Sequence, residues 1–335
     1  MKKIMNNPAN FVDEVMEGII FAYNDKVKLL DNDKRILLSN YPKNEEKVGI
    51  VTAGGSGHLP LFLGYVGSGM LDGCAVGNVF ASPSASKMAD MIKACDSGNG
   101  VLCLFGNYGG DKMNFEMACD IVSMDDIETQ SILVKDDVAS SSIENADKRR
   151  GVAGILYAYK IAGAAADNLM SLDEVVEITN LALKNIKTMG VATSPCIVPE
   201  VGKPTFQIND DEIEIGMGIH GEKGIDIKKM MSADEIAETC LTKIMNELEL
   251  NSGDEVSVMI NGLGATPLEE QFLVYRKVAQ ILKDKGVSIF MPHIGEFATS
   301  MEMAGLSITL FKLNDKFKSL LKQPAETPFY TSLNK

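Results

Sequence analysis

The chain has 335 residues, of which 45% are hydrophobic and 23% charged, as is ordinary for a globular protein large enough for two domains. Its formal net charge of −14 argues against direct binding to nucleic acid or to an anionic membrane, because both need a basic surface. The first residues, MKKIMNNPANF, lack the apolar core of a signal peptide, and no apolar run approaches the ~18 residues of a membrane span, so we expect a cytoplasmic protein.

The six cysteines show no C-x-x-C spacing, and most of them lie within apolar runs. This pattern favours reduced thiols in the core over disulfides or metal ligands. We therefore expect no metal site on this chain.

The first half of the chain alternates helical and strand patterns. Asn7 and Pro8 precede a helix whose apolar residues recur at i, i+4 spacing. Residues 48–52, VGIVT, predict a buried strand that leads directly into AGGSGHLP. The glycines let the backbone approach a ligand, and they leave Ser56 and His58 at the carboxyl end of a strand, where open α/β sheets bind ligands.

This glycine-rich turn does not carry the known nucleotide or hydrolase signatures. Residues 54–60 match neither G-x-G-x-x-G nor G-x-x-x-x-G-K-[ST]. His58 stands where the G-x-S-x-G nucleophile elbow has its last glycine. The turn therefore predicts a small-ligand site of another kind.

Two further strands end in small polar turns. The run Gly73–Phe80 leads to Ser82 and Pro83, which suit the N-cap and first position of a helix. The run Gly100–Phe105 leads to a turn that contains Asp111. Because the carboxyl ends of parallel strands converge, Asp111 is a candidate acid or base, although an aspartate in such a turn more often serves as a turn or N-cap residue.

The middle of the chain predicts a domain boundary. Arg149 and Arg150 open an alanine-rich helix, where a solvated helix start is the favoured interpretation over a phosphate clamp. Ser171 caps a further helix, Leu172–Met189, that Gly190 ends. The proline-rich stretch after it indicates a domain crossing, so we expect two α/β domains at 1–190 and 191–335.

The second half again alternates strands with helices. Glu212–Ile215 predicts a strand that leads into GMGIHGE, where His220 stands between glycines. The third histidine, His293, follows a proline at a strand end, and we interpret it as structural. In the carboxyl-terminal tail, Phe329 and Tyr330 could pack back on the first domain.

Eight segments, in this order, resemble the K subunit family of dihydroxyacetone kinase: GGSGHLP, NVFASPS, NYGGDKMNFEMA, DDVAS, RRGVAGILYAYKIAGAAA, GIHGEKG, NGLGATPLEE and ATSMEMAG. The resemblance covers essentially the whole chain. It implies two α/β domains with a ligand site between them at the strand carboxyl ends, a homodimer, and dihydroxyacetone or a similar short ketose as ligand. It also implies that no cofactor binds this chain: ADP and magnesium belong to a separate L subunit, and an M component rephosphorylates that ADP.

The resemblance implies roles residue by residue. It places the covalent histidine at His220 and an acid/base pair at Asp111 and His58. The implied substrate contacts are Gly55, Ser56, Gly57 and Ser82. A neutral imidazole can add to a ketone carbonyl to form a hemiaminal, whereas glycerol has no such electrophile. The held ketose would then present its terminal hydroxyl to a phosphate, with Asp111 accepting the proton, so the resemblance implies a phosphotransferase that works with partner subunits.

Several neighbours depart from the family pattern GGGSGHEP, EVFTSP and HGEPG. The residues that depart from these patterns are Ala53, Leu59, Asn78, Ala81 and Lys223. In addition, Gly106 stands where the family usually has a lysine, before Asn107 and Tyr108. Three interpretations stay open. The retained Asp111 and His58 favour a kinase subunit for dihydroxyacetone, whereas small Gly106 and Ala81 would suit another ketose such as erythrulose. The altered neighbours favour a dihydroxyacetone-sensing co-activator that contacts a transcription factor.

Overall fold

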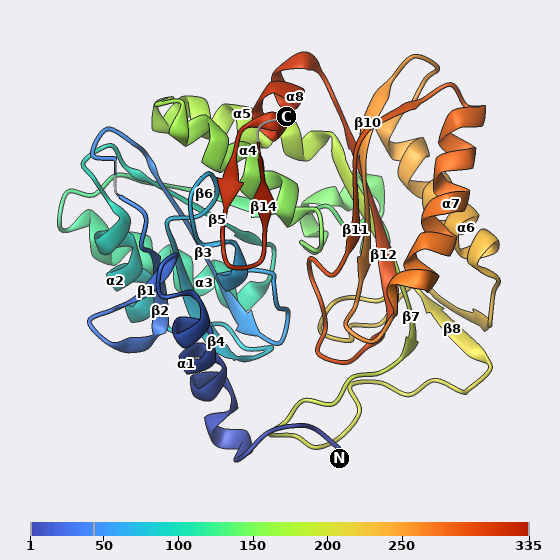
Figure 1. Ribbon diagram of the computed structural model, residues 1–335, viewed down its shortest axis with the longest axis horizontal. Coiled ribbons are helices and arrows are strands. Elements are labelled where there is room, and N and C mark those ends of the chain that lie inside the picture. Colours follow the sequence, from blue (N-terminus) through green and yellow to red (C-terminus); the bar gives the residue numbers. More distant parts are fainter. Residues whose placement is uncertain (1, 43, 334–335) are drawn as a thin grey trace. The chain divides into compact units, whose positions relative to one another are not determined.

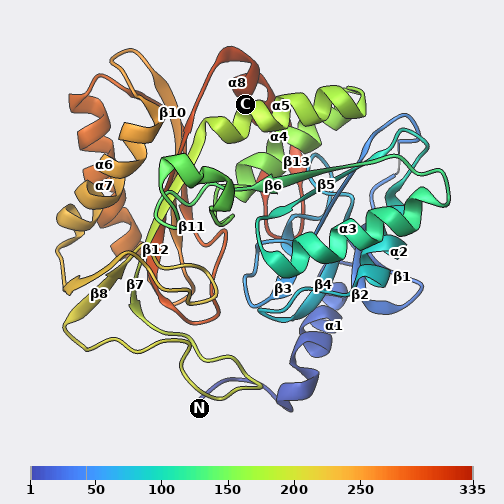
Figure 2. The ribbon, with the colours of Figure 1, turned by 180° about the vertical axis from the view of Figure 1, so that it is seen from behind.

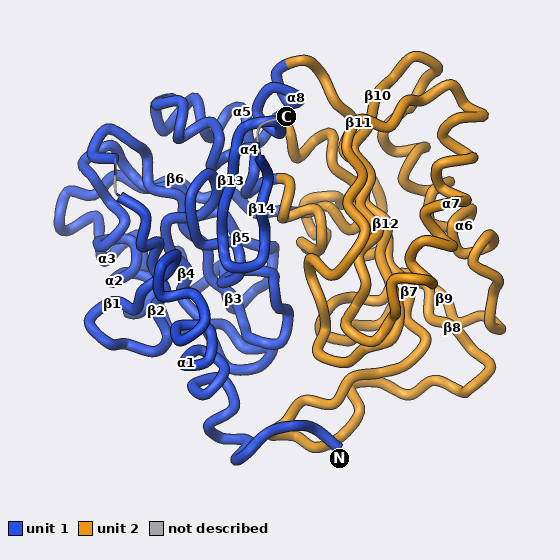
Figure 3. Tube along the Cα trace, in the orientation of Figure 1, with its two compact units in different colours: residues 1–134, 158–181, 316–335 blue, residues 135–157, 182–315 orange. Residues whose placement is uncertain are grey.

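The computed structural model describes residues 2–42 and 44–333, which fold into mixed α/β structure (Figure 1). Contacts divide the chain into two compact units (Figure 3). Unit 1 contains the chain up to Val134, Ala158–Leu181 and the chain from Lys316, and unit 2 contains Lys135–Tyr157 and Ala182–Asp315. The sequence patterns suggested one division after residue 190, whereas the chain passes from one unit to the other four times, after residues 134, 157, 181 and 315.

Unit 1 is built on a six-stranded sheet in the order β1-β2-β4-β3-β5-β6. Its strands are β1 (Val27–Leu30), β2 (Asp33–Ser39), β3 (Gly49–Ser56), β4 (Gly73–Val79), β5 (Val101–Gly106) and β6 (Thr129–Val134). The last four strands run parallel, and the β1–β2 hairpin adds antiparallel beside β4. In the sheet, β4 lies on one side of β3, and β5, the next strand along the chain, lies on the other side. The strand order therefore reverses between β3 and β5, and open α/β sheets bind ligands at such a switch point.

Strand β3 is longer than the sequence pattern predicts. It continues through the first glycines of the turn, because Gly54 and Gly55 pair with Val76 and Gly77 of the parallel strand β4. The hairpin β1–β2 is absent from the sequence prediction. Its turn residues Asp31 and Asn32 both have positive φ, of 47° and 63°, without the glycine that usually marks such a turn.

The helices that belong wholly or partly to unit 1 are η1 (Pro8–Asn10), α1 (Phe11–Tyr23), η2 (Leu63–Tyr65), α2 (Ala85–Cys95), α3 (Gly109–Ser123), α4 (Ile155–Asp167), α5 (Leu172–Lys184) and α8 (Asp315–Lys322). Helices α2 and α3 lie side by side and pack on the parallel strands (Figure 2). The apolar cluster beneath them includes Met88, Ile92, Val101, Cys103 and Phe115. These two helices therefore anchor the turns that follow β4 and β5.

Unit 2 contains a second six-stranded sheet in the order β11-β10-β12-β7-β8-β9, in which only β10 and β11 run parallel. Its strands are β7 (Ile186–Ser194), β8 (Glu212–Ile215), β9 (Asp226–Lys229), β10 (Glu255–Gly262), β11 (Ser288–Gly295) and β12 (Ala304–Lys312). Helices α6 (Ala233–Leu248) and α7 (Leu268–Asp284) lie side by side and pack on it (Figure 1). A short helix, η3 (Ile143–Lys148), precedes α4. Mixed α/β structure in both units confirms the predicted fold class.

Two helix predictions are wrong at their ends. The predicted helix Leu172–Met189 ends as α5 at Lys184, and Gly190 lies inside strand β7. The tertiary context decides this point, because β7 pairs with β12 along its length and with β8 on its other edge, at Val191 and Ala192. Helix α2 begins at Ala85 with Ser84 as its N-cap, so the predicted N-cap Ser82 and first residue Pro83 lie before the helix. The chain first turns back toward β4, through the hydrogen bond from Ala81 N to Asn78 O, of 3.0 Å.

The arginine pair does not open a helix, and it is not solvated. Helix α4 begins at Ile155, and Arg149 is only 1% exposed. Its guanidinium donates to both carboxylate oxygens of Glu247. Arg150 pairs with the carboxylate of Asp137 instead. Burial with matched carboxylates explains why the expected solvated helix start is wrong.

The carboxyl-terminal tail packs within unit 1. It forms a small hairpin of β13 (Ala325–Glu326) and β14 (Thr331–Ser332). The ring of Phe329 lies edge-on to Tyr23, with centroids 5.4 Å apart, and Tyr330 lies edge-on to Tyr65 at 6.3 Å. The six cysteines are free thiols, five of them buried, as expected. Among the described helices, none has the length and apolar character needed to cross a bilayer.

Candidate functional site

Three turns gather at the carboxyl end of the parallel strands in unit 1. Ser56 ends β3, and its hydroxyl donates to the Gly77 carbonyl of β4 at 2.8 Å. A Cβ at Gly55 would lie 2.6 Å from the backbone N of Ala81, so only glycine lets the β3 and β4 turns approach this closely. Gly57 has a φ of +99°, which favours glycine and turns the chain toward His58.

His58 is held by aromatic rings. Its side chain is buried, and its imidazole stacks on Phe80 with centroids 4.8 Å apart and planes 18° apart. Phe62 contacts the imidazole edge-on, with centroids at 5.9 Å. Phe80 has a φ of +59°, which is strained for a bulky residue. The hydrogen bond from the backbone N–H of Phe80 to the Ser56 carbonyl maintains this conformation. The turn after β4 therefore fixes the plane of this histidine.

Asp111 lies in the first turn of α3 and is 6% exposed. A carboxylate is favoured there, because the backbone N–H groups of a helix start carry partial positive charge. A Cβ at the neighbouring Gly110 would lie 2.7 Å from the hydroxyl of Ser82, so Ser82 packs against the start of α3. Asn114 strengthens this junction by donating to the Pro83 carbonyl at 2.7 Å. The β4 turn thus contacts both the β3 turn and the start of α3.

The second histidine site lies in unit 2, in the turn between β8 and β9. The Nδ1 atom of His220 lies 2.8 Å from Oε1 of Glu222, and the backbone N–H of His220 donates to Oε2 at 2.9 Å. Burial raises the pKa of Glu222, but the hydrogen bonds from His220 and the positive charge of its protonated imidazole outweigh this effect and lower the pKa to about 2. Glu222 is therefore ionised at neutral pH and can only accept a hydrogen bond. The proton of the neutral imidazole must lie on Nδ1, which makes the Nε2 lone pair the nucleophile.

The glycines of this turn, Gly216, Gly218 and Gly221, have the spacing G-x-G-x-x-G. The turn joins two antiparallel strands, β8 and β9, whereas the dinucleotide motif requires a strand followed by a helix. The glycines here serve close packing instead. A Cβ at Gly218 would lie 2.1 Å from Oε2 of Glu222.

The structure brings six of the predicted site residues to the carboxyl ends of β3, β4 and β5 in unit 1. They are Gly55, Ser56, Gly57, His58, Ser82 and Asp111. The seventh, His220, belongs to unit 2 and has its own carboxylate partner. Glu222 is not among the predicted site residues, although a carboxylate two residues after a histidine in a glycine turn is a usable signal.

The third histidine, His293, lies on strand β11 among aromatic side chains. Its Nδ1 is 3.3 Å from the hydroxyl of Tyr157, and its ring lies edge-on to Phe297 at 5.8 Å. The Tyr157 hydroxyl also contacts Ser257, at 2.8 Å. These contacts agree with a structural role. Burial lowers the pKa of His293 to about 4.

Acid should destabilise the protein through His293. Its pKa is about 4 in the folded protein and about 6.5 when unfolded, so the unfolded chain binds more protons between these values. The contribution of neutral His293 to the free energy of unfolding is complete above pH 6.5 and is lost as the pH falls to 4. We expect a loss of about 1–3 kcal/mol, at the lower end if the partly exposed ring is screened by solvent. Urea unfolding at pH 7.5, 6, 5 and 4 measures this loss. A His293→Gln variant should lose less stability than the wild type between pH 7.5 and pH 4. A loss equal to that of the wild type would show that His293 does not cause the acid destabilisation.

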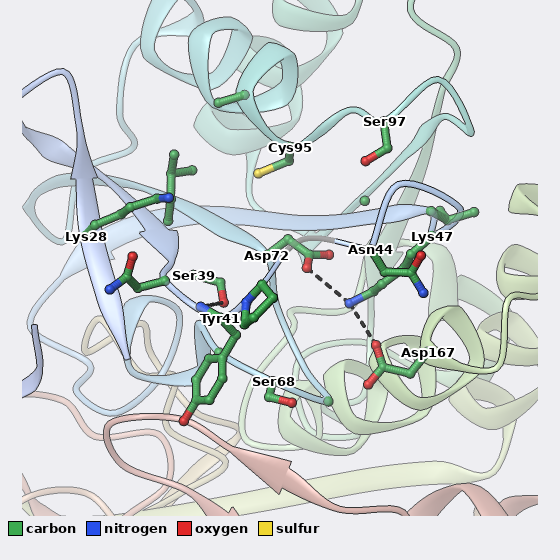
Figure 4. Close-up of a pocket in the computed structure, with 18 residues that line it drawn as sticks. Lys28, Ser39, Tyr41, Asn44, Lys47, Ser68, Asp72, Cys95, Ser97 and Asp167 are labelled. Carbon is green, nitrogen blue, oxygen red and sulfur yellow. Dashed lines mark hydrogen bonds and ion pairs between the residues drawn. The ribbon is translucent and has the colours of Figure 1, made fainter. Parts of the chain in front are cut away.

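A cavity of about 370 Å³ lies elsewhere in unit 1 (Figure 4). It is lined by residues that precede β3 and β4, such as Lys47 and Asp72, and so lies at the amino ends of these strands. Lys47 bridges Asp72 and Asp167 at 3.0 and 2.9 Å. None of the predicted site residues is among its described lining. Within residues 2–42 and 44–333, no three His, Cys, Asp or Glu side chains are grouped to hold a metal ion.

Comparison with known proteins identifies the family. Residues 17–329 match the family model described as the Dak1 domain. The chain is 43% identical over 330 residues to the "PTS-dependent dihydroxyacetone kinase 2, dihydroxyacetone-binding subunit DhaK" of Listeria innocua, covering 98% of this chain and 99% of that protein. It is 38% identical to the "L-erythrulose kinase" of Pectobacterium atrosepticum, covering 98% of this chain and 56% of that protein.

A solved structure described as "Dihydroxyacetone kinase operon co-activator Dha-DhaQ" has a TM-score of 0.89 to this chain at 30% identity, covering 96% of this chain and 98% of the other. The family match and the Listeria relative both extend over most of the chain. The glycine-rich turns, Asp111 and the histidine turn therefore lie on a protein that belongs to the Dak1 domain family.

Proposed function

We propose that this chain is the dihydroxyacetone-binding subunit of a phosphotransferase-linked dihydroxyacetone kinase. The observation that carries the proposal is the hydrogen bond between Nδ1 of His220 and ionised Glu222, which makes Nε2 the nucleophile. Nε2 forms a bond to the ketone carbon, the π electrons of the carbonyl move to its oxygen, and that oxygen takes up a proton from water, which leaves an imidazolium with its proton on Nδ1. Glu222 balances the positive charge that the imidazole gains, so the hemiaminal is stabilised as it forms.

In this proposal, unit 1 prepares the hydroxyl that is phosphorylated. Asp111 accepts its proton, with His58 held by Phe80 as the second acid/base group. The Ser56 hydroxyl donates to the Gly77 carbonyl and can accept a hydrogen bond from the small polar substrate, and the Ser82 hydroxyl provides a second contact. In this proposal, the phosphoryl group, ADP and magnesium come with a separate L subunit, because phosphoryl transfer needs metal ions or cations that stabilise charge on the phosphate. We further propose a homodimer that acts in the cytoplasm.

Two observations favour other members of the same family. The relative named L-erythrulose kinase, together with the small residues Gly106 and Ala81, favours a kinase subunit for a four-carbon ketose. The likeness to the co-activator structure favours a sensor that binds dihydroxyacetone and contacts a transcription factor. Both buried acid/base residues, Asp111 and His58, favour the kinase, since capture alone does not need them.

The experiment combines the protein with an ADP-loaded L subunit and its phosphoryl donor system, and it measures ketose phosphate with dihydroxyacetone and with erythrulose. Native intact-mass spectrometry records the adduct in parallel. Turnover supports the kinase, and the faster ketose identifies the substrate. An adduct without turnover, with an L subunit that is active on a known K subunit, supports the sensor. The absence of any adduct contradicts covalent capture.

A further inference from the structure

We propose that Arg150 is a positioning residue that holds the turn of His220 and thereby maintains the reactive tautomer of its imidazole. The inference rests on the proposed capture of a ketone by His220. Arg150 lies in the loop between η3 and α4, far from the turn in the sequence. Its side chain is 13% exposed and hydrogen-bonds to the backbone of the turn.

The guanidinium joins the two ends of the turn. Its Nη2 donates to the Gly216 carbonyl at 2.9 Å, and its Nη1 donates to the Glu222 carbonyl at 3.4 Å. The same Glu222 carbonyl accepts the N–H of Gly218 at 3.0 Å, which closes the turn. A planar group with several fixed donors can span both carbonyls, whereas a lysine ammonium is a point charge and cannot.

Asp137 holds the guanidinium in place. Its Oδ2 accepts from Nε of Arg150 at 2.9 Å and lies 2.7 Å from Nη2. Its Oδ1 accepts the N–H of Ala139 at 3.0 Å, so the carboxylate is itself oriented. A Cβ at Gly216 would lie 2.6 Å from the Cβ of Ala139, so the Asp137 loop packs directly against the turn. The arginine therefore has one defined position.

The guanidinium of Arg150 and the carboxylate of Glu222 pack against one backbone position. A Cβ at Gly218 would lie 2.5 Å from Nη1 of Arg150 and 2.1 Å from Oε2 of Glu222. Only glycine leaves room for both groups. Movement of the guanidinium would therefore release the backbone carbonyl of Glu222 and shift the backbone from which the Glu222 carboxylate reaches His220. His220 would then lose the acceptor that keeps the proton on Nδ1.

The test uses three variants with a dual readout. Arg150→Lys keeps the charge but loses the two-carbonyl contact. Asp137→Asn combined with Arg150→Gln removes the ion pair without leaving a buried charge unpaired. Arg149→Lys is the matched control, because that arginine pairs with Glu247 outside the turn. For each folded protein, ¹⁵N NMR of the His220 ring reports the tautomer, and time-resolved mass spectrometry reports the rate of dihydroxyacetone capture.

We expect Arg150→Lys and the double variant to give mixed tautomers and capture about 10- to 100-fold slower, the range that a small misplacement of a reacting group produces. The Arg149→Lys control should keep the wild-type tautomer and rate whatever its melting temperature. Wild-type tautomer and rate in folded Arg150→Lys would overturn the proposal. If the wild type forms no adduct, the proposed function fails, while the tautomer readout still decides the role of Arg150.

Discussion

Replacing His220 with alanine should abolish the covalent adduct with dihydroxyacetone. The variant removes the Nε2 atom that forms the bond, and the described turn contains no second imidazole to replace it. Native intact-mass spectrometry should change from an adduct in the wild type to none in the variant. Turnover with the L subunit should fall to background in the same preparation, because the substrate is no longer held in position.

His293→Gln is the matched control for this experiment. It removes another histidine of unit 2 that contacts Tyr157 and Phe297 rather than the β8–β9 turn. Its adduct should equal that of the wild type at neutral pH. An unchanged adduct in His220→Ala would rule out His220 as the covalent residue. An adduct lost in both variants would show that the loss follows from altered packing of unit 2.

Replacing Asp111 with asparagine should separate capture from turnover. Asparagine has nearly the same shape and can keep the start of α3 intact, but it cannot accept a proton. The hemiaminal should form at the wild-type level, whereas phosphoryl transfer to the ketose should fall by about 10²–10⁴-fold, the usual contribution of a general base. Steady-state kinetics with a fixed excess of L subunit, together with intact mass, measure both quantities.

Asp120→Asn provides the control on the same helix. This aspartate is exposed on α3 and lies away from the helix start. The Asp120→Asn variant should leave capture and turnover unchanged, because Asp120 lies away from the helix start that holds Asp111 and because replacing a solvated side chain changes the stability little. Wild-type turnover in Asp111→Asn would remove Asp111 from the mechanism. Loss of the adduct in that variant would instead assign Asp111 to substrate binding.

Local sequence patterns predicted the positions of most strands and the turns that follow them. The glycine-rich turn after β3 and the acidic turn after β5 both stand next to short apolar runs, and parallel strands place such turns at one edge. The sequence patterns did not predict the strands β1 and β2. The β1–β2 hairpin turns on Asp31 and Asn32, so the usual glycine signal is missing.

The region 186–194 shows where local patterns fail. Its residues continue the apolar pattern of α5, and Gly190 resembles a helix stop. Hydrogen bonds to β12 and β8, from more distant segments, make it a strand within the sheet. Only the partners that a segment meets in the folded protein decide such cases.

By itself, the sequence determined which residue types could carry chemistry and that they follow strands in glycine-rich turns, because strand patterns and turn residues are local properties. Only the tertiary structure decided which groups control them. Burial against Phe80 orients His58, and the contact with Glu222 selects the nucleophilic nitrogen of His220. Arg150, expected to be solvated, contacts this turn from a distant loop. Contacts between distant segments leave no periodic signal in the sequence, so burial and pairing become visible only in the folded chain.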